Sequence, residues 1–324
     1  MIDLKNGDYG MKIGIVGGGS IARKGYLPLL VSWPSIEIAG ICSRSVKTAD
    51  EICEQWHITF GTTQLSELLA HGIDAAFVLT PTPNHFDIVQ ELLSTGVDVF
   101  VEKPATQSSS QTHSLADLAQ QKGRVFMVGF NRRYAPLYRQ AKELFRNRRI
   151  GFCIVEKHRT SAYHTSLLNN YLDDTIHLID LLYYYCPDPQ PVHTSFEMSD
   201  GKLIGASSTA RLEGGGIGMV NTCLQAGSWQ ERVTIHGDGL TVEVNAFREL
   251  RIKMGDHEEV YGIDRPGRWF PELAERGFSG EIEHFFDCMR TRAEPETNGE
   301  EAFKSQQFME KLVAIATPAA GPGL

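Results

Sequence analysis

Hydrophobic residues between positions 11 and 128 come in short runs that alternate with amphipathic segments. The runs cover residues 12–16, 36–42, 75–79, 97–101 and 125–128. The segments between them repeat their apolar residues at helical spacing, at 21–31, 48–56, 65–69, 86–93 and 115–121. Strands that alternate with helices indicate right-handed crossovers and a doubly wound, mostly parallel sheet. The first part of the chain is therefore predicted to be an α/β domain.

The pattern changes after residue 130. Helical stretches at 136–145 and from about 174 to 185 flank a strand at 152–159. Segments of period two follow, with turns such as Gly237-Asp238-Gly239 between them. These segments are 192–198, 203–212, 217–224, 231–236, 240–244 and 250–254, and two helical patterns, 280–290 and 300–317, come after them. We expect an α+β domain with a large, open-faced, mostly antiparallel sheet, whose open face suits a partner subunit.

The 324 residues are thus expected to form a flexible extension (1–10), a first domain (11–130) and a second domain (131–324). The C-terminal helix of the second domain is expected to pack back on the first. A net charge of -9 argues against nucleic acid or an anionic membrane surface as the main partner, because both select basic proteins.

The chain carries no sign of a membrane or secretory destination. No apolar run approaches the roughly 20 residues of a membrane span. The polar first ten residues lack the order of a secretion signal. The six cysteines show no Cys-x-x-Cys and no pairing pattern, which is typical of free thiols in a reducing compartment. We therefore expect a cytoplasmic protein.

A glycine-rich turn follows the first predicted strand. Gly17 and Gly19, with Ala22 in the third place, match the dinucleotide fingerprint of a Rossmann domain. Backbone N–H groups near Ser20 and Ile21 would then meet a pyrophosphate at the start of the next helix. A plain structural turn is the competing interpretation, and the βαβ context disfavours it.

The second strand ends without the carboxylate that commonly binds the adenosine ribose. Ser43 and Arg44 stand there instead, a hydroxyl and a guanidinium that suit a 2′-phosphate. NADP(H) is therefore the preferred cofactor, and NAD(H) remains possible if Arg44 is only an exposed residue at a helix start.

The third βα junction reads Thr80-Pro81-Thr82-Pro83-Asn84-His85. Its prolines favour an extended turn at the carboxyl edge of the sheet, where ligands of open α/β sheets bind. Thr80, Pro81, Asn84 and His85 are candidate cofactor-binding residues. Asn84 is equally well explained as a helix cap.

Three side chains are candidates for the chemistry. Glu102-Lys103-Pro104 ends a strand at the same edge, so Lys103 can place a positive charge beside a developing alkoxide. Asp173 and His177 are four residues apart on one predicted helix face. His177, in the first turn of that helix, is expected to be neutral and to accept a proton, and Asp173 to orient it. A metal site on Asp173, His177 and Asp180 is disfavoured, because no further ligand completes it.

These motifs together resemble the Gfo/Idh/MocA family (glucose–fructose oxidoreductase and inositol dehydrogenase) over residues 11–317. The resemblance includes Gly129-Phe130-Asn131-Arg132-Arg133-Tyr134 and Thr297-Asn298-Gly299-Glu300-Glu301-Ala302. Two stretches, Glu156-Lys157-His158-Arg159 and Leu172-Asp173-Asp174, are similar to the MviM-like branch.

The resemblance implies an NAD- or NADP-dependent oxidoreductase acting on sugars, polyols or related hydroxy compounds, assembled as a homodimer or homotetramer through the open sheet. Lys103, Asp173 and His177 would form the catalytic set, and Glu102 would contact the nicotinamide ribose. The residues implied on the substrate side are Asn131, Arg132 and Asp174.

Two departures from the family pattern bear on the substrate. Residues 167–171 replace a glycine cluster, and Asp174 and Thr175 replace small residues. An extra carboxylate at Asp174 favours a hydroxyl-rich or cationic group. Alternatively, Arg159, near Tyr163 and His164, holds an anionic sugar acid, or it is an exposed strand residue.

Two other functions stay open. One keeps the cofactor but uses it in elimination or glycosidic cleavage, with the nicotinamide reduced and re-oxidised in each turnover. The other is a non-catalytic NADP(H) sensor, which the presence of Lys103, Asp173 and His177 disfavours.

Overall fold

The computed structural model of the protein describes residues 10–262 and 271–319. Residues 1–9 of the expected N-terminal extension (1–10) lie outside the described residues. The chain forms two compact units. The first consists of the described residues up to Gly129 together with Glu281–Ala302, and the second of Phe130–Gly280 and the described residues from Phe303 onward.

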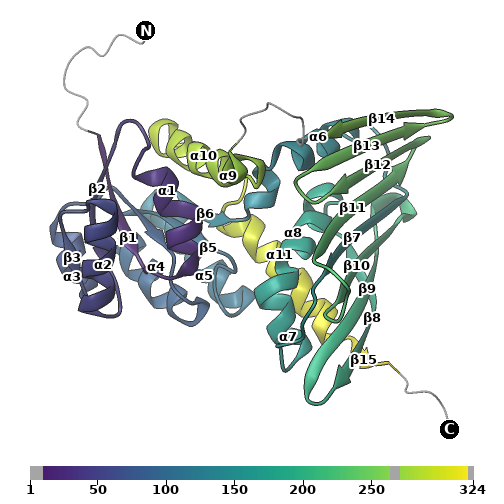
Figure 1. Ribbon diagram of the computed structural model, residues 1–324, viewed down its shortest axis with the longest axis horizontal. Coiled ribbons are helices and arrows are strands. Elements are labelled where there is room, and N and C mark those ends of the chain that lie inside the picture. Colours follow the sequence, from purple (N-terminus) through teal and green to yellow (C-terminus); the bar gives the residue numbers. More distant parts are fainter. Residues whose placement is uncertain (1–9, 263–270, 320–324) are drawn as a thin grey trace. The chain divides into compact units, whose positions relative to one another are not determined.

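The first unit is built on a parallel sheet of six strands in the order β3-β2-β1-β4-β5-β6 (Figure 1). The strands are β1 (Met11–Val16), β2 (Ile36–Cys42), β3 (Gly61–Thr62), β4 (Ala75–Val78), β5 (Asp98–Glu102) and β6 (Phe126–Gly129). Strand order reverses between β1 and β4, the position at which open α/β sheets bind ligands beyond the carboxyl ends of their strands.

Helical segments connect these strands. They are η1 (Ala22–Tyr26, a π-helical turn), α1 (Leu27–Leu30), α2 (Val46–Trp56), α3 (Leu65–Ala70), η2 (Thr82–Asn84), α4 (His85–Ser94) and α5 (Ser109–Lys122). The ring of Phe77 stacks on that of Phe100 in the middle of the sheet, with centroids 4.9 Å apart. Phe285, from α10 (Phe278–Thr291), packs edge-on against both rings. A segment late in the chain therefore completes the core of the first unit.

The second unit contains a nine-stranded sheet in the order β14-β13-β12-β11-β7-β10-β9-β8-β15. Its strands are β7 (Phe152–His158), β8 (Gln190–Ser199), β9 (Lys202–Arg211), β10 (Ile217–Cys223), β11 (Gln230–Gly237), β12 (Leu240–Asn245), β13 (Glu249–Met254), β14 (His257–Gly262) and β15 (Ala316–Pro318). Among the described strands of this sheet, only β7·β10 and β8·β15 pair in parallel. The predicted fold class, a Rossmann domain followed by a large and mostly antiparallel sheet, is confirmed.

Helices of the second unit lie against one face of this sheet (Figure 1). They include α6 (Pro136–Leu144), after the short η3 (Asn131–Tyr134), and a run formed by α7 (Leu167–Asn170), the π-helical turn η4 (Tyr171–Thr175) and α8 (Ile176–Tyr185). Alternate residues of β7 and β10 are buried on the helix side. The opposite residues, such as Ile154 and Met219, are only half-buried, so they mark the open face of the sheet.

Some elements differ from those expected. The helical run begins at Leu167, ahead of the expected start near residue 174, because Ser166 caps it by accepting the Asn169 N–H. The predicted helix at 300–317 ends earlier: α11 covers Gly299–Ala314, and β15 follows. Strand β14 is an exposed edge strand without the apolar alternation that would reveal it. Two further short elements are η5 (Glu213–Gly215) and α9 (Glu272–Glu275).

Candidate active site

The glycine turn joins β1 to η1. Gly17 has φ +105°, and a Cβ there would lie 2.7 Å from the Leu79 carbonyl, so only glycine fits. A Cβ at Gly19, in contrast, would meet no heavy atom within 4 Å. Packing within the protein therefore does not explain Gly19, whereas close approach of a ligand to the backbone does.

The same edge of the sheet holds an unsatisfied hydroxyl. Thr80 follows β4, and its Oγ1 is buried without a hydrogen-bond partner among the described residues. A buried polar atom without a partner is costly, and a ligand is one way to satisfy it. Together with the open space at Gly19, this hydroxyl shows that the turn and its neighbouring loop fit a dinucleotide cofactor.

Ser43 and Arg44 follow β2, as expected. Ser43 is buried, and its backbone N–H donates to Thr62 O at 2.9 Å. The Arg44 side chain is exposed and makes no ion pair within the described part of the chain. Ser45 caps α2 by accepting the Thr48 N–H, so the helix is held without help from Arg44. The guanidinium is thus available to a ligand.

In the loop after β4, Asn84 is exposed to solvent whereas His85 is buried. Asn84 is exposed and makes no side-chain capping bond, so its geometry gives the cap interpretation no support. His85 is 1% exposed, with Nε2 2.7 Å from Thr80 O and Nδ1 3.0 Å from Pro104 O. Burial lowers the pKa of this histidine. His85 therefore links the Thr80-Pro81 loop to the turn that carries Lys103.

Glu102 and Lys103 lie at the carboxyl end of β5. Glu102 is buried; its Oε1 accepts the Tyr26 hydroxyl at 2.7 Å, and its Oε2 accepts the Lys103 N–H at 3.0 Å. Tyr26 also lies 2.9 Å from Glu281 Oε1, and burial followed by these two carboxylates raises the pKa of Tyr26. Lys103 is half-buried, and the Lys103–Pro104 peptide is cis. The Glu102 carboxylate thus binds the backbone of the turn at Lys103.

Asp173 and His177 lie in the helical run of the second unit. Asp173 belongs to η4, and its side chain is 61% exposed. His177 is buried in the first turn of α8. Asp173 Oδ2 lies 3.0 Å from Nε2 of His164, a buried residue. His164 was noted in the sequence only as a neighbour of Arg159, and no spacing rule indicated this contact.

Behind η4, five charged side chains and a tyrosine form a network that is buried except for the partly exposed Arg159. Asp174 accepts two hydrogen bonds from Arg159 and lies 2.5 Å from Lys157 Nζ. Glu231 accepts a two-point contact from Arg132, at 2.7 and 2.8 Å, and the Tyr138 hydroxyl at 2.8 Å. The network contains three cations and two carboxylates.

The protonation of the network follows from its burial. Burial lowers the pKa of Lys157 to about 8, and the nearby Arg132 adds to this effect. Burial alone would raise the pKa of Asp174, but Arg159 and Lys157 outweigh it and lower that pKa. Asp174 is therefore ionised and neutralised within the protein, which weakens the argument that it attracts a cationic substrate.

The residues expected on the substrate side are largely engaged with protein groups. Asn131 Nδ2 donates to Arg276 O at 2.8 Å, and Arg132 pairs with Glu231. Arg159 is about one-third exposed and uses Nε and Nη2 on Asp174. Their roles toward a substrate stay predictions.

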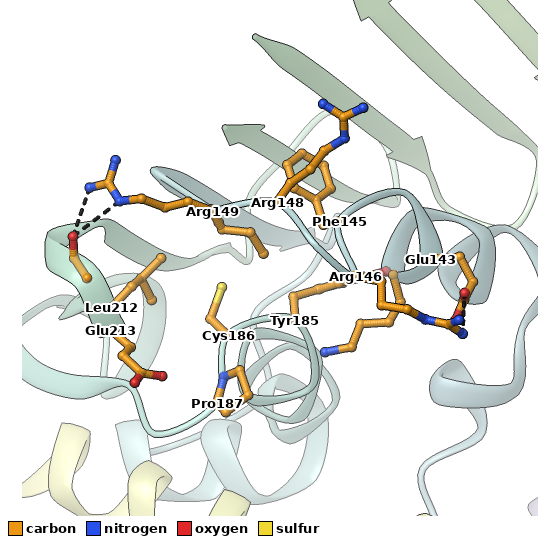
Figure 2. Close-up of a pocket in the computed structure, with 13 residues that line it drawn as sticks. Glu143, Phe145, Arg146, Arg148, Arg149, Tyr185, Cys186, Pro187, Leu212 and Glu213 are labelled. Atoms are coloured by element: carbon orange, nitrogen blue, oxygen red, sulfur yellow. Dashed lines mark hydrogen bonds and ion pairs between the residues drawn. The ribbon is translucent and has the colours of Figure 1, made fainter. Parts of the chain in front are cut away.

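A separate hollow of about 420 Å³ lies near the C-terminal end of α8 (Figure 2). It is not lined by Asp173 or His177. Three of the four cations that line it have local partners: Arg149 donates to Gly214 O at 2.9 Å, Arg146 pairs with Glu143, and Lys142 donates to Tyr184 O. We assign this hollow no part in the site.

Two further searches concern only the described residues. They contain no group of three or more His, Cys, Asp or Glu side chains arranged to hold a metal ion. None of their helices combines the length and the apolar character that crossing a bilayer requires.

Comparison with known proteins decides the family. The profile described as "Oxidoreductase family, NAD-binding Rossmann fold" matches residues 11–130. The YceM protein of Salmonella typhimurium, described as an oxidoreductase, is 34% identical over 313 residues, covering 93% of this chain and 97% of that protein. The chain belongs to the Gfo/Idh/MocA oxidoreductase family.

Other family members agree with this assignment. The dehydrogenase MviM from Clostridium difficile has a solved structure with 29% identity and a TM-score of 0.85, covering 94% of this chain and 99% of that one. The scyllo-inositol 2-dehydrogenase (NAD(+)) of Bacillus subtilis is 23% identical, with 89% of each chain covered. The family resemblance inferred from the motifs, including its MviM-like branch, is confirmed. The protein is thus an oxidoreductase.

Proposed function

We propose that this Gfo/Idh/MocA oxidoreductase transfers a hydride between NADP(H) and a hydroxyl-bearing carbon of a sugar, a polyol or a related compound. The observation that carries the proposal is the cofactor edge of the first unit. There, Gly19 leaves open space, Thr80 Oγ1 has no partner among the described residues, and Lys103 stands on a turn fixed by Glu102. The names of relatives such as scyllo-inositol 2-dehydrogenase support the substrate class.

The catalytic roles in this proposal follow the family motif. The nicotinamide, when bound, accepts or supplies the hydride. His177 takes the proton of the substrate hydroxyl, and its burial excludes competing water. Asp173 orients the imidazole, and the Lys103 ammonium stabilises the negative charge that develops on the substrate oxygen.

We infer the cofactor preference from Arg44. It is exposed beside the end of β2 and makes no ion pair within the described residues. A guanidinium in this position can bind a 2′-phosphate with two parallel hydrogen bonds. NAD(H) is the alternative cofactor, as the name of the Bacillus relative indicates for that protein.

Assembly and location also belong to the proposal. The open face of the nine-stranded sheet is half-buried at its centre, around Ile154 and Met219. We infer a homodimer or homotetramer formed through this face. All six cysteines are free thiols, which supports a cytoplasmic location.

The test is a binding titration followed by a turnover assay. NADPH and NADH fluorescence would first be titrated against the wild type. Oxidation of myo-inositol, scyllo-inositol, D-glucose and D-xylose would then be followed as growth of reduced-cofactor absorbance. Lys103→Met should lower kcat by about 100-fold or more while NADPH affinity changes little. Lys122→Met, at an exposed position on α5, is the matched control.

Three outcomes would count against the proposal. If the wild type binds neither cofactor, the cofactor assignment fails. If Lys103→Met turns over as fast as Lys122→Met, the catalytic set is wrong. Product formation without net cofactor reduction would favour elimination over simple dehydrogenation.

A further inference from the structure

His164 belongs to a chain of hydrogen bonds that joins Thr175 to Asp173. The side chain is 6% exposed, and the ring of Tyr163 packs against it with centroids 4.0 Å apart. The Leu203 N–H donates to His164 O at 2.9 Å, which ties the backbone of this irregular segment to β9. His164 is thus a fixed point in a segment that has little regular structure of its own.

The hydrogen-bond partners of the ring assign its tautomer. Thr175 Oγ1 donates to Asn170 Oδ1 at 2.8 Å, which orients the amide so that its NH₂ faces His164. Asn170 Nδ2 lies 3.2 Å from His164 Nδ1, so Nδ1 must be the acceptor. The ring hydrogen is then on Nε2, which lies 3.0 Å from Asp173 Oδ2 and donates to it.

We propose that His164 is a positioning residue for Asp173, held by Asn170 and Thr175 in the tautomer that carries its hydrogen on Nε2. The proposal rests on the proposed function, in which Asp173 orients the proton acceptor His177.

The physical reason lies in the exposure of Asp173. A side chain that is 61% exposed can rotate among rotamers unless a contact holds it. Both Asn170 and Thr175 are buried and bound to each other, so the amide cannot turn without losing a hydrogen bond. The direction of donation is therefore transmitted from Thr175 through Asn170 and His164 to the carboxylate.

The first test reads the tautomer directly. In ¹⁵N-histidine-labelled wild-type protein, long-range ¹H–¹⁵N spectra distinguish a protonated Nε2 from a protonated Nδ1. The His164 signals would be assigned as those lost in His164→Gln. We expect a hydrogen on Nε2 and a bare Nδ1 at pH 7. The opposite tautomer would overturn the proposal.

The second test reverses the direction of the hydrogen bond between Asn170 and His164 by a substitution that changes a single heavy atom. Asn170→Asp replaces the NH₂ group by an acceptor oxygen, so Nδ1 should become protonated. Asn169→Asp makes the same chemical change at the neighbouring exposed position and should leave the His164 spectrum unchanged.

Turnover then separates a positioning role from a purely structural one. With a substrate identified among the four named sugars and polyols, Asn170→Asp should lower kcat about 10-fold or more relative to Asn169→Asp, with unchanged KM for the cofactor. Equal kcat in the two variants would overturn the proposal. If Asn170→Asp does not fold, the wild-type tautomer and the kcat of His164→Gln decide instead.

Failure of the two proposals can be told apart. A wild type that binds no nicotinamide cofactor contradicts the proposed function, whatever the tautomer. A wild type that binds cofactor and oxidises a substrate but carries the His164 hydrogen on Nδ1 contradicts only the role of His164.

Discussion

Lys157 is buried between two carboxylates that already have arginine partners. Its side chain is 5% exposed; Asp174 is shared with Arg159, and Glu231 with Arg132. With three cations and two carboxylates, the network holds one positive charge more than it can pair. Since a buried charge is costly unless fully compensated, the ammonium of Lys157 lowers the stability of the folded state near neutral pH.

The stability of the wild type should therefore rise with pH relative to Lys157→Met. Below pH 8, Lys157 is charged in both the folded and the unfolded chain, and its burial cost is fully present. Between pH 8 and the ordinary lysine pKa of about 10.4, only the folded chain has released the proton, so the cost disappears. Urea unfolding should show the difference in unfolding free energy shifting by about 1–3 kcal/mol in favour of the wild type between pH 7 and pH 10. A flat difference would contradict the assigned charge state.

Arg44 should select the cofactor. Loss of a charge-assisted contact to the 2′-phosphate costs about 1.5–3 kcal/mol, or roughly 10- to 100-fold in affinity. Arg44→Ala should weaken NADPH binding by that amount and leave NADH binding within about twofold. Lys47→Ala, at another exposed position close by, controls for a general loss of positive charge. Equal binding of NADPH and NADH by the wild type would make Arg44 a bystander.

The sequence predicts the position of some site residues but not the tertiary contacts of others. It predicts Lys103 at a strand end and Arg44 without a carboxylate neighbour, because both follow from short-range order along the chain. It does not predict that Asp174 meets Arg159 and Lys157, or that His164 meets Asp173. Those contacts depend on how a helix and an irregular segment pack over a sheet, and no periodicity encodes that packing.

Among the elements, the glycine turn combines two glycines with different physical causes. Gly17 has a positive φ and no room for a Cβ, whereas a Cβ at Gly19 would meet no heavy atom within 4 Å. The backbone conformation and the nearby Leu79 carbonyl require glycine at position 17. The approach of a ligand explains glycine at position 19.

Two alanine variants should separate these causes. Gly17→Ala should lower the free energy of unfolding by about 2 kcal/mol or more, because the methyl group meets the Leu79 carbonyl at a strained φ. Gly19→Ala should leave stability within about 0.5 kcal/mol. It should still weaken NADPH binding, because the methyl group fills the space that the pyrophosphate needs. Thermal unfolding and fluorescence titration of both variants check this, and normal NADPH binding by Gly19→Ala would contradict the ligand explanation.

Five of the six strands of the first unit, all but β3, were predictable because buried parallel strands are continuous apolar runs. Strand β3 has two residues, and β14 is exposed along nearly its whole length. Neither leaves a hydrophobic pattern. Their existence follows from pairing with β2 and β13, which is a tertiary property.

For the whole molecule, the open face of the large sheet should control assembly. Met219 lies beside Ile154 across the β7·β10 pair, and both are half-buried on the face away from the helices. Met219→Glu would place a charge in the centre of this face. If the face joins subunits, the charge should dissociate the oligomer while the fold persists.

Light scattering on a size-exclusion column measures this directly. Met254→Glu makes the same substitution at an exposed strand end and should leave the oligomer intact. A wild-type monomer, or a Met219→Glu variant with unchanged mass, would contradict assembly through this face.

The first unit is discontinuous along the chain, and this limits how the family can recombine. Asn298 bridges Met127, Arg292 pairs with the buried Asp98, and Phe285 completes the aromatic core of the sheet. The matched stretch 11–130 therefore lacks part of its own interior. An exchange of the second unit between relatives therefore needs three crossover points, near residues 130, 280 and 302. A single crossover near residue 130 would combine the six-stranded sheet of one relative with residues 281–302 of another, although these two parts pack into one core.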